Sequence, residues 1–164
     1  MSAQTVWNIL LWVHYFLLSL WIGGIFFFTA VAAPAIRRSM ASKAVAGEIV
    51  NKILKRFNLI ELICCFTLIS FLFSSFRFVP GKNGPVEILM GILTFMGLLT
   101  YFYAFRLAPR MESIRQNTPT FHDLSKGHAS RQTYERLHRL YVRLVAVNFL
   151  LGLGVLYGSI VVLH

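Results

Sequence analysis

Two ionisable side chains, His14 and Glu61, lie inside long apolar stretches of this sequence. No Asp, Glu, Lys or Arg occurs from residue 1 to residue 36, and Glu61 alone interrupts a second apolar run. Ionisable groups are costly within a membrane, so each is a candidate for function. His14 has two possible roles. It is a ligand of haem or of a metal through an imidazole nitrogen, or it is a neutral side chain hydrogen-bonded to a hydroxyl such as that of Thr94.

The spacing around His14 predicts which way it points. Trp7, His14, Trp21 and Phe28 are each seven residues apart, so they share one helical face that we expect to point into a bundle. A haem held by two histidines needs a second histidine at the same depth. His138 and His164 lie at other depths, so the sequence offers no such pair.

Glu61 lies near the start of the second apolar run, Arg106 ends the third and Arg143 begins the fourth. In antiparallel spans these three positions lie toward the same side of the membrane. One hypothesis is an interfacial ion pair that locks the helices together. The alternative is a proton or cation relay, because carboxylates inside helical bundles serve that purpose in transporters. Tyr141 and Asn148 complete the polar intramembrane cluster that the sequence predicts.

Small and polar residues recur along the last apolar run. Tyr141, Asn148, Gly152 and Ser159 form one stripe, which is typical of packing between helices in lipid. We predict close helix approach at five glycines: Gly23, Gly24, Gly152, Gly154 and Gly158.

The sequence predicts no catalytic residue and no metal centre. His122 and His128 match no strong zinc spacing. No arrangement of serine, histidine and aspartate, or of cysteine and histidine, is evident. The adjacent Cys64 and Cys65 point about 100° apart on a helix, so we interpret them as small apolar residues.

These residues need elements that hold them in a membrane. The chain has 164 residues, of which 57% are hydrophobic and only 13% charged. A soluble domain is about 25% charged. Runs of about 20 apolar residues predict transmembrane helices. We therefore expect one all-α domain over residues 1–164, an integral membrane four-helix bundle with spans at about 5–31, 57–78, 86–107 and 139–162.

Lysine and arginine placement predicts the topology. The first connection holds six of these residues and the third holds eight, against two in the second connection and none in the tails. The positive-inside rule makes the two basic connections cytoplasmic and puts both termini outside, in what we expect to be a bacterial cytoplasmic membrane. The net charge of +10 then reflects anionic lipid rather than nucleic acid. A cleaved signal peptide is the alternative for the first span, but it lacks a basic start and the apolar stretch is too long.

The first connection has its own pattern. Ala46, Val50, Ile53, Leu54 and Phe57 recur at helical spacing, which predicts a cytoplasmic interfacial amphipathic helix running into the second span. Six basic residues are the predicted contacts with lipid headgroups: Arg37, Arg38, Lys43, Lys52, Lys55 and Arg56.

Several motifs together resemble a known family. They are Val13-His14 with Trp21-Ile22-Gly23-Gly24, then Leu107-Ala108-Pro109-Arg110, then Leu137-His138-Arg139 with Asn148. The combination resembles the transmembrane protein 205-like domain family, whose function is unknown. More distantly, the first motif resembles the copper-resistance D proteins and the J-type protoporphyrinogen oxidases. The second likeness implies a haem b ligand at His14 and extends to no other residue.

Three functions remain open. The first is a non-enzymatic bundle, acting as an accessory subunit of a larger membrane complex or in small-molecule handling. The second is a haem b- or copper-binding redox protein that uses His14. The third is a small transporter that uses Glu61, as a homo-oligomer because four short helices enclose little volume.

An absorption spectrum of the purified protein, with metal analysis, separates the first two. Haem ligation by His14 predicts a Soret band that disappears in the His14→Ala variant. A spectrum without that band, from protein that also carries no copper, would exclude the redox hypothesis.

Overall fold

The computed structural model describes residues 2–75, 83–118, 121 and 128–163. Within these ranges, four helical segments are long and apolar enough to cross a membrane. They are Gln4–Ser39, Ala44–Ser75, Gly84–Gln116 and Ala129–Leu163. The described chain contains no strand. The prediction of an all-α bundle with four spans is therefore confirmed.

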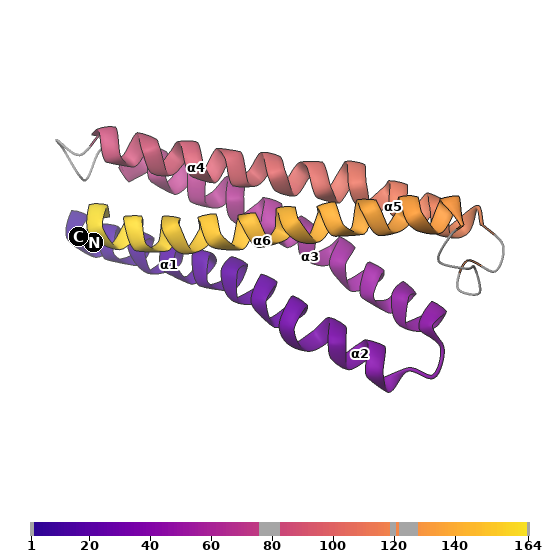
Figure 1. Cartoon of the computed structure of the whole chain (residues 1–164). Coiled ribbons are helices and arrows are strands. Elements are labelled where there is room, and N and C mark those ends of the chain that lie inside the picture. Colours follow the sequence, from indigo (N-terminus) through magenta and orange to yellow (C-terminus); the bar gives the residue numbers. More distant parts are fainter. Residues whose placement is uncertain (1, 76–82, 119–120, 122–127, 164) are drawn as a thin grey trace.

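The elements follow in chain order, and two of them are π-helical turns, labelled η. They are α1 (Ala3–Phe27), η1 (Phe28–Ala32), α2 (Ala33–Ser39), α3 (Lys43–Ser75), α4 (Asn83–Phe102), η2 (Tyr103–Leu107), α5 (Ala108–Gln116) and α6 (Ala129–Leu163). Figure 1 shows that α1 begins and α6 ends at the same end of the bundle, whereas α2 and α5 lie at the opposite end. We call that opposite end the basic end.

Two of the four segments pass through a proline without ending. In the first, the N–H of Ala33 bonds to the carbonyl of Phe28 five residues back, just before Pro34. The same π-helical geometry precedes Pro109 in the third. Proline lacks an N–H and its ring crowds the preceding turn, and a widened turn accommodates both defects. The first helical segment therefore does not end at Pro34 but continues to Ser39.

The predicted interfacial segment is a direct continuation of α3. This helix runs for 33 residues, which is about 50 Å at 1.5 Å per residue. Ala46 and Val50 are buried inside the protein, and Asn51 donates a 2.9 Å hydrogen bond to Glu112 on α5. Protein thus covers most of the apolar face of this segment, but Ile53, which the spacing places on that face, is 41% exposed. Its basic face, with Lys52, Lys55 and Arg56, is the face left exposed.

The outer surface of the bundle is apolar. In the most apolar stretch of each segment, only 28–39% of the residues are buried. Phe66 is 76% exposed, Tyr157 72% and Trp12 69%. A water-soluble protein does not expose large apolar side chains on this scale. The four helices therefore contact the lipid bilayer, and the chain is an integral membrane protein.

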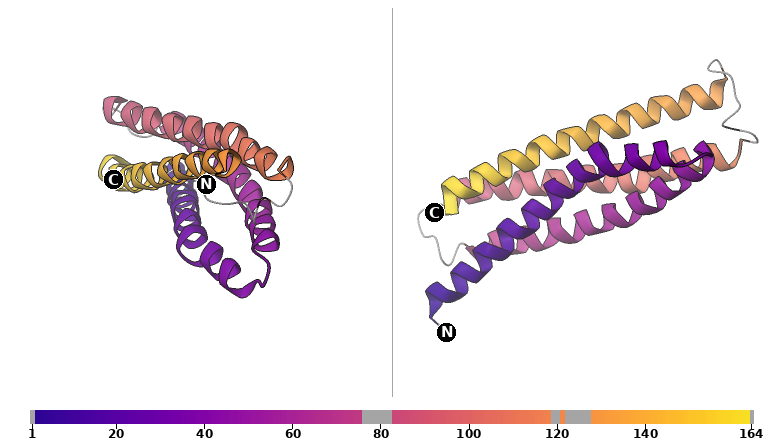
Figure 2. Two further views of the ribbon diagram at one scale, coloured as in Figure 1. Left: turned by 45° about the vertical axis from the view of Figure 1, so that its right-hand side comes forward. Right: turned by 90° about the horizontal axis from the view of Figure 1, so that it is seen from below.

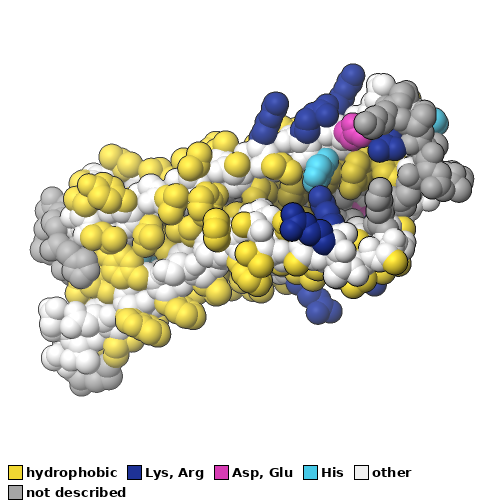
Figure 3. All heavy atoms as spheres, turned by 60° about the horizontal axis from the view of Figure 1, so that its bottom comes forward, with side chains coloured by type: hydrophobic (Ala, Val, Ile, Leu, Met, Phe, Trp, Pro, Cys, Tyr) yellow, Lys and Arg dark blue, Asp and Glu magenta, His cyan; other side chains and the backbone are white. Residues whose placement is uncertain are grey.

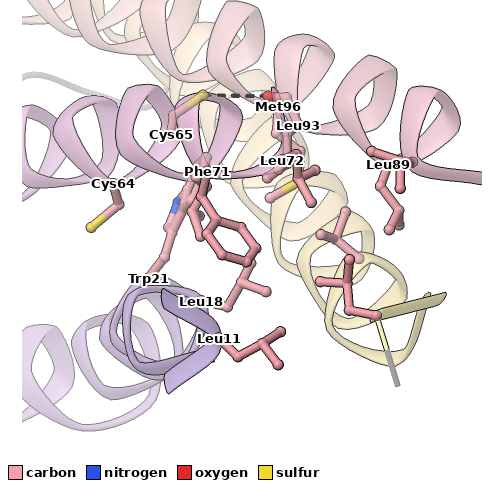
Figure 4. Packing of buried hydrophobic residues seen from close by; sticks show 14 of the residues in the cluster. Leu11, Leu18, Trp21, Cys64, Cys65, Phe71, Leu72, Leu89, Leu93 and Met96 are labelled. Atoms are coloured by element: carbon pink, nitrogen blue, oxygen red, sulfur yellow. Dashed lines mark hydrogen bonds between the residues drawn. The ribbon is translucent and has the colours of Figure 1, made fainter. Parts of the chain in front are cut away.

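The core of the bundle is filled by large side chains from all four segments. Trp7, His14, Trp21 and Phe28 are all buried, as their spacing predicts. Figure 4 shows Leu18 and Trp21 of α1 pointing toward Phe71 and other core residues of α3. The thiol of Cys65 lies 3.4 Å from the carbonyl oxygen of Leu93 on α4, while Cys64 is also buried and unbridged. Both cysteines serve as small core residues, as the sequence suggests.

The helices separate toward the basic end. α1 packs against both α3 and α6, whereas α2 packs against α3. Figures 1 and 2 show the first segment turning away from α6 as it approaches α2. The tight packing around Leu18 and Trp21 therefore gives way to a more open arrangement near α2.

The predicted packing glycines divide into two groups. A Cβ on Gly152 would lie 2.9 Å from Cγ1 of Ile22, and one on Gly158 would lie 2.8 Å from Cδ2 of Leu89. A Cβ on Gly24 would overlap the ring of Phe57. By contrast, a Cβ on Gly23 or Gly154 would meet no atom within 4 Å. Gly97, which the sequence analysis passed over, also lies in close contact, with the thiol of Cys65.

Gly152 and Gly154 are two residues apart but differ in the space around them, so they allow a matched test. We expect Gly152→Leu to destabilise the protein by about 1–3 kcal/mol, since the side chain has no room beside Ile22. Gly154→Leu adds the same side chain two residues away on an open surface and is the control. The thermal unfolding midpoint in detergent measures both. Equal effects of the two substitutions would contradict the packing described above.

Candidate functional site

A buried carboxylate connects the four helical segments. Glu61 on α3 is only 2% exposed. Its Oε1 accepts a 3.0 Å hydrogen bond from the indole N–H of Trp21 on α1. Its Oε2 accepts a 2.8 Å hydrogen bond from the hydroxyl of Tyr103, the first residue of η2. Both carboxylate oxygens are thus held by neutral donors from two other segments.

The network continues from Tyr103 to the fourth segment. The amide nitrogen of Asn148 on α6 donates to the Tyr103 hydroxyl at 3.2 Å and to the Thr100 hydroxyl at 3.0 Å. Thr100 in turn donates to the carbonyl of Met96 at 3.1 Å. Tyr103, Thr100 and Asn148 are fully buried. Because each hydroxyl has one proton, the donors form a directed chain from Asn148 through Tyr103 to Glu61.

The predicted ion pair of Glu61 with Arg106 and Arg143 does not form. Both arginines are exposed, and no described cation pairs with Glu61. Bringing a guanidinium into the bundle would require removing its hydration, which costs several kcal/mol per ion. An indole and a phenol supply the donors at a lower desolvation cost. Tyr141 and Asn148 are buried as predicted, and the two arginines are not part of this cluster.

A second polar contact lies one helical turn from Glu61. The hydroxyl of Tyr141 on α6 donates to Oδ1 of Asn58 on α3 at 3.4 Å. The Tyr141 ring also makes an edge contact with Tyr103, with ring centroids 5.2 Å apart. Tyr141 therefore lies between the Glu61 network, which its ring contacts through Tyr103, and the part of the bundle that opens toward the basic end.

A cavity of about 450 Å³ opens at the basic end, and we call it the basic-end cavity. Its walls come from α1, η1, α2, α3, α5 and α6. Apolar and aromatic side chains dominate these walls, among them Ile25, Phe26, Phe28, Phe57, Val145 and Phe149. Figure 3 shows lysine and arginine side chains gathered at one end of the visible face, where the surface is hollowed.

Polar groups lie at two levels of this cavity. Glu61, Asn58 and Tyr141 line it and are buried, so they form its inner part. Arg37, which is exposed, and His138, which is partly buried, line it closer to the ends of their helices. The cavity thus combines an apolar body, an inner acidic and amide group and basic side chains at its mouth.

His14 lies in a different part of the bundle. Its Nε2 is 3.0 Å from the hydroxyl oxygen of Ser159 on α6, and both residues are buried. The predicted hydroxyl partner is therefore found, but on another helix. Thr94 is exposed and donates to the carbonyl of Met90 at 2.8 Å. Ser159 belongs to the polar stripe on α6, which faces the interior of the bundle.

A smaller cavity of about 230 Å³ adjoins His14 between α1 and α3. The Nδ1 atom of His14 is buried without a hydrogen-bond partner among the described residues. The ring lies over that of Phe71, with centroids 4.5 Å apart. The described residues contain no group of three histidine, cysteine, aspartate or glutamate side chains that could hold a metal ion. His122 and His164 lie outside the described residues.

Three buried polar residues in or beside the Glu61 network were not predicted from the sequence. Tyr103, Thr100 and Asn58 did not enter the predicted cluster, and Trp21 entered only as an aromatic face. A signal existed for Asn58, because it precedes Glu61 by three residues and therefore lies on the same helical face. For the π-helical turn that begins at Tyr103, the sequence gives no indication other than Pro109, which follows it.

Comparison with known proteins gives one family match. Residues 16–119 match a domain of unknown function, DUF4149, which covers more than half of the chain. No curated protein and no solved structure matches the chain. The matched region includes Trp21, Glu61 and Tyr103, so most of the carboxylate network lies within it.

Removing one hydroxyl tests the network. Tyr103→Phe leaves Oε2 of Glu61 without its donor and removes an acceptor of Asn148. We expect a loss of about 1–3 kcal/mol in unfolding free energy, the usual cost of buried unpaired polar groups. Tyr101→Phe, at a tyrosine two residues away that is 54% exposed, is the matched control. Unfolding of both variants in detergent is the measurement, and an unchanged midpoint for Tyr103→Phe would refute the role given to its hydroxyl.

Proposed function

Since the chain belongs to the DUF4149 family, we propose a function from its own geometry: it is a non-enzymatic membrane protein that binds a small, largely apolar molecule in the basic-end cavity. The basic-end cavity is the observation that carries this proposal. Its volume of about 450 Å³ falls within the usual range of about 300–1,000 Å³ for small-molecule sites.

The composition of the cavity supports this function. Sites for small molecules are mainly apolar, with a few polar groups that fix the orientation of the ligand. Here Phe28, Phe57 and Phe149 supply aromatic walls, while Asn58 and Tyr141 supply polar groups. With the topology predicted from basic residues, the mouth faces the cytoplasmic leaflet, and a ligand enters from that leaflet or from the cytoplasm.

The transporter hypothesis uses the same cavity. Glu61 lines the cavity, and hydrogen bonds connect it through Tyr103 to Asn148. A ligand that enters from the basic end would therefore meet a chain of buried polar side chains at the inner part of the cavity. Transport adds movement of the ligand across the bilayer. Flux into liposomes that is unaffected by Glu61→Gln would count against it.

Two further hypotheses rest on the sequence. A haem b- or copper-binding role for His14, implied by the likeness to copper-resistance D proteins and J-type protoporphyrinogen oxidases, would use the free Nδ1 atom. The absorption spectrum described above decides it. An accessory role in a larger complex predicts stoichiometric co-purification with other membrane proteins. The likeness to the transmembrane protein 205-like family favours none of these functions over another.

Filling the cavity tests the proposed function. Leu54 lines it, and Leu54→Trp should reduce its volume and its occupancy by a ligand. The probe is dodecanol carrying a diazirine in its chain, photoactivated in liposomes that contain the protein. We expect labelled peptides from the cavity walls in the wild type and at least fivefold less of this labelling in Leu54→Trp.

The adjacent Ile53 provides the control. It is 41% exposed and is not part of the cavity, so Ile53→Trp should leave the labelling of the cavity unchanged. If dodecanol labels only lipid-facing residues such as Phe66, in all three proteins alike, the cavity is not a binding site for apolar molecules.

A further inference from the structure

We propose that the ligand of the basic-end cavity is a lipophilic cation, an apolar body with an ammonium centre, and that its positive charge lies beside Glu61. This assignment rests on the proposed function, because it names the class of molecule that the cavity takes. Three features of the cavity lead to it: a carboxylate without a cation, aromatic rings in the walls between that carboxylate and the mouth, and basic side chains that are confined to the mouth.

The first feature is the incomplete pairing of Glu61. A carboxylate can accept about four hydrogen bonds, and Glu61 accepts one on each oxygen from Trp21 and Tyr103. These donors are neutral, so they orient the group and bring no positive charge to it. The ion pairs of the described residues join Lys52 with Glu48, Arg115 with Glu112 and Arg131 with Glu135, and none reaches Glu61. The acidic group at the inner part of the cavity therefore lacks a positive partner.

The second feature is the set of aromatic rings in the cavity walls near Glu61 and toward the mouth. Phe57 lies one helical turn before Glu61 on α3, so the two side chains share a face. The Phe57 ring stacks with that of Phe28, with centroids 6.4 Å apart. Tyr141 and Phe149 add rings from α6. Aromatic faces attract ammonium groups, and this attraction strengthens where water is excluded.

The third feature is the position of the basic side chains. Arg37 lies sixteen residues beyond Trp21 in the first helical segment, about 24 Å along its axis at 1.5 Å per residue. His138 lies ten residues before Asn148, about 15 Å along α6. Both line the mouth rather than the inner part.

This arrangement decides between a cationic and an anionic ligand. An anionic headgroup held at Arg37 brings no positive charge to Glu61, and the part of such a ligand that extends inward is apolar. The carboxylate would then be covered without a new partner, which is the costly case for a buried charge. A cation that reaches Glu61 supplies the missing partner and leaves the mouth hydrated.

The test compares three photoactivatable probes with the same twelve-carbon chain in liposomes containing the full-length protein. They are dodecyltrimethylammonium, dodecanol and dodecanoate, each carrying a chain diazirine. Labelling of cavity residues is normalised to that of the lipid-facing Phe66, which corrects for partition into the bilayer. We expect the cation to label the cavity at least tenfold more than dodecanoate and more than dodecanol.

Two substitutions identify the group responsible. Glu61→Gln keeps the shape of the side chain, removes its charge and replaces one acceptor oxygen with an amide donor. It should lower cavity labelling by the cation at least tenfold. Glu48→Gln removes a carboxylate that is exposed and outside the cavity, and it should leave that labelling unchanged. Dodecanol labelling of Glu61→Gln reports whether the cavity persists in that variant.

The outcomes are distinct. Equal cavity labelling by all three probes, unaltered by Glu61→Gln, would overturn the cation assignment while leaving a cavity that binds apolar molecules. Preferential labelling by dodecanoate would assign the site to an anion held at the mouth. Cavity labelling by none of the probes would remove the proposed function as well.

Discussion

The structure depends on one buried carboxylate that every helical segment must reach. Glu61 belongs to α3, Trp21 brings a donor from α1, and Tyr103 brings one from η2. Asn148 links the fourth segment through the Tyr103 hydroxyl. A buried acidic group without partners is too costly to persist, so each helix must present its donor at the same depth. The network therefore fixes the relative depth of helices whose apolar contacts alone would permit sliding.

The same network divides the bundle into two parts. On the side of the chain ends, Leu18, Leu68 and Leu72 are fully buried and the helices pack closely. On the other side, η1 and η2 widen the helices before Pro34 and Pro109, and the first segment diverges from α6. The basic-end cavity lies in this second part, with Glu61 at the boundary. The basic-end cavity thus lies where the close packing of the helices ends, and the buried polar side chains Glu61, Asn58 and Tyr141 line its inner part.

His14, a candidate ligand by sequence, has a structural role in the bundle. Its contact with Ser159 joins α1 to α6 on the side of the Glu61 network nearer the chain ends, and a second hydrogen bond from Tyr15 to the Ser159 carbonyl, at 3.1 Å, reinforces the same junction. Together with the Glu61 network, this contact holds α1 at two levels along its length. The free Nδ1 atom beside a small cavity keeps a ligand role for His14 open to the spectroscopic test.

The sequence by itself determined the class of fold, the four spans and the faces that point inward, because apolar length and helical spacing are local properties of the chain. It also singled out Glu61, Asn148 and His14, since polar side chains are conspicuous in apolar runs. Only the tertiary structure decided their partners. Arg106 and Thr94 were reasonable by depth, yet both point outward, and Tyr103 and Ser159 take their places. Depth follows from sequence position, but direction depends on how the helices, two of them widened before prolines, rotate against one another. The basic-end cavity depends on the same rotation and divergence, so no local pattern could reveal it.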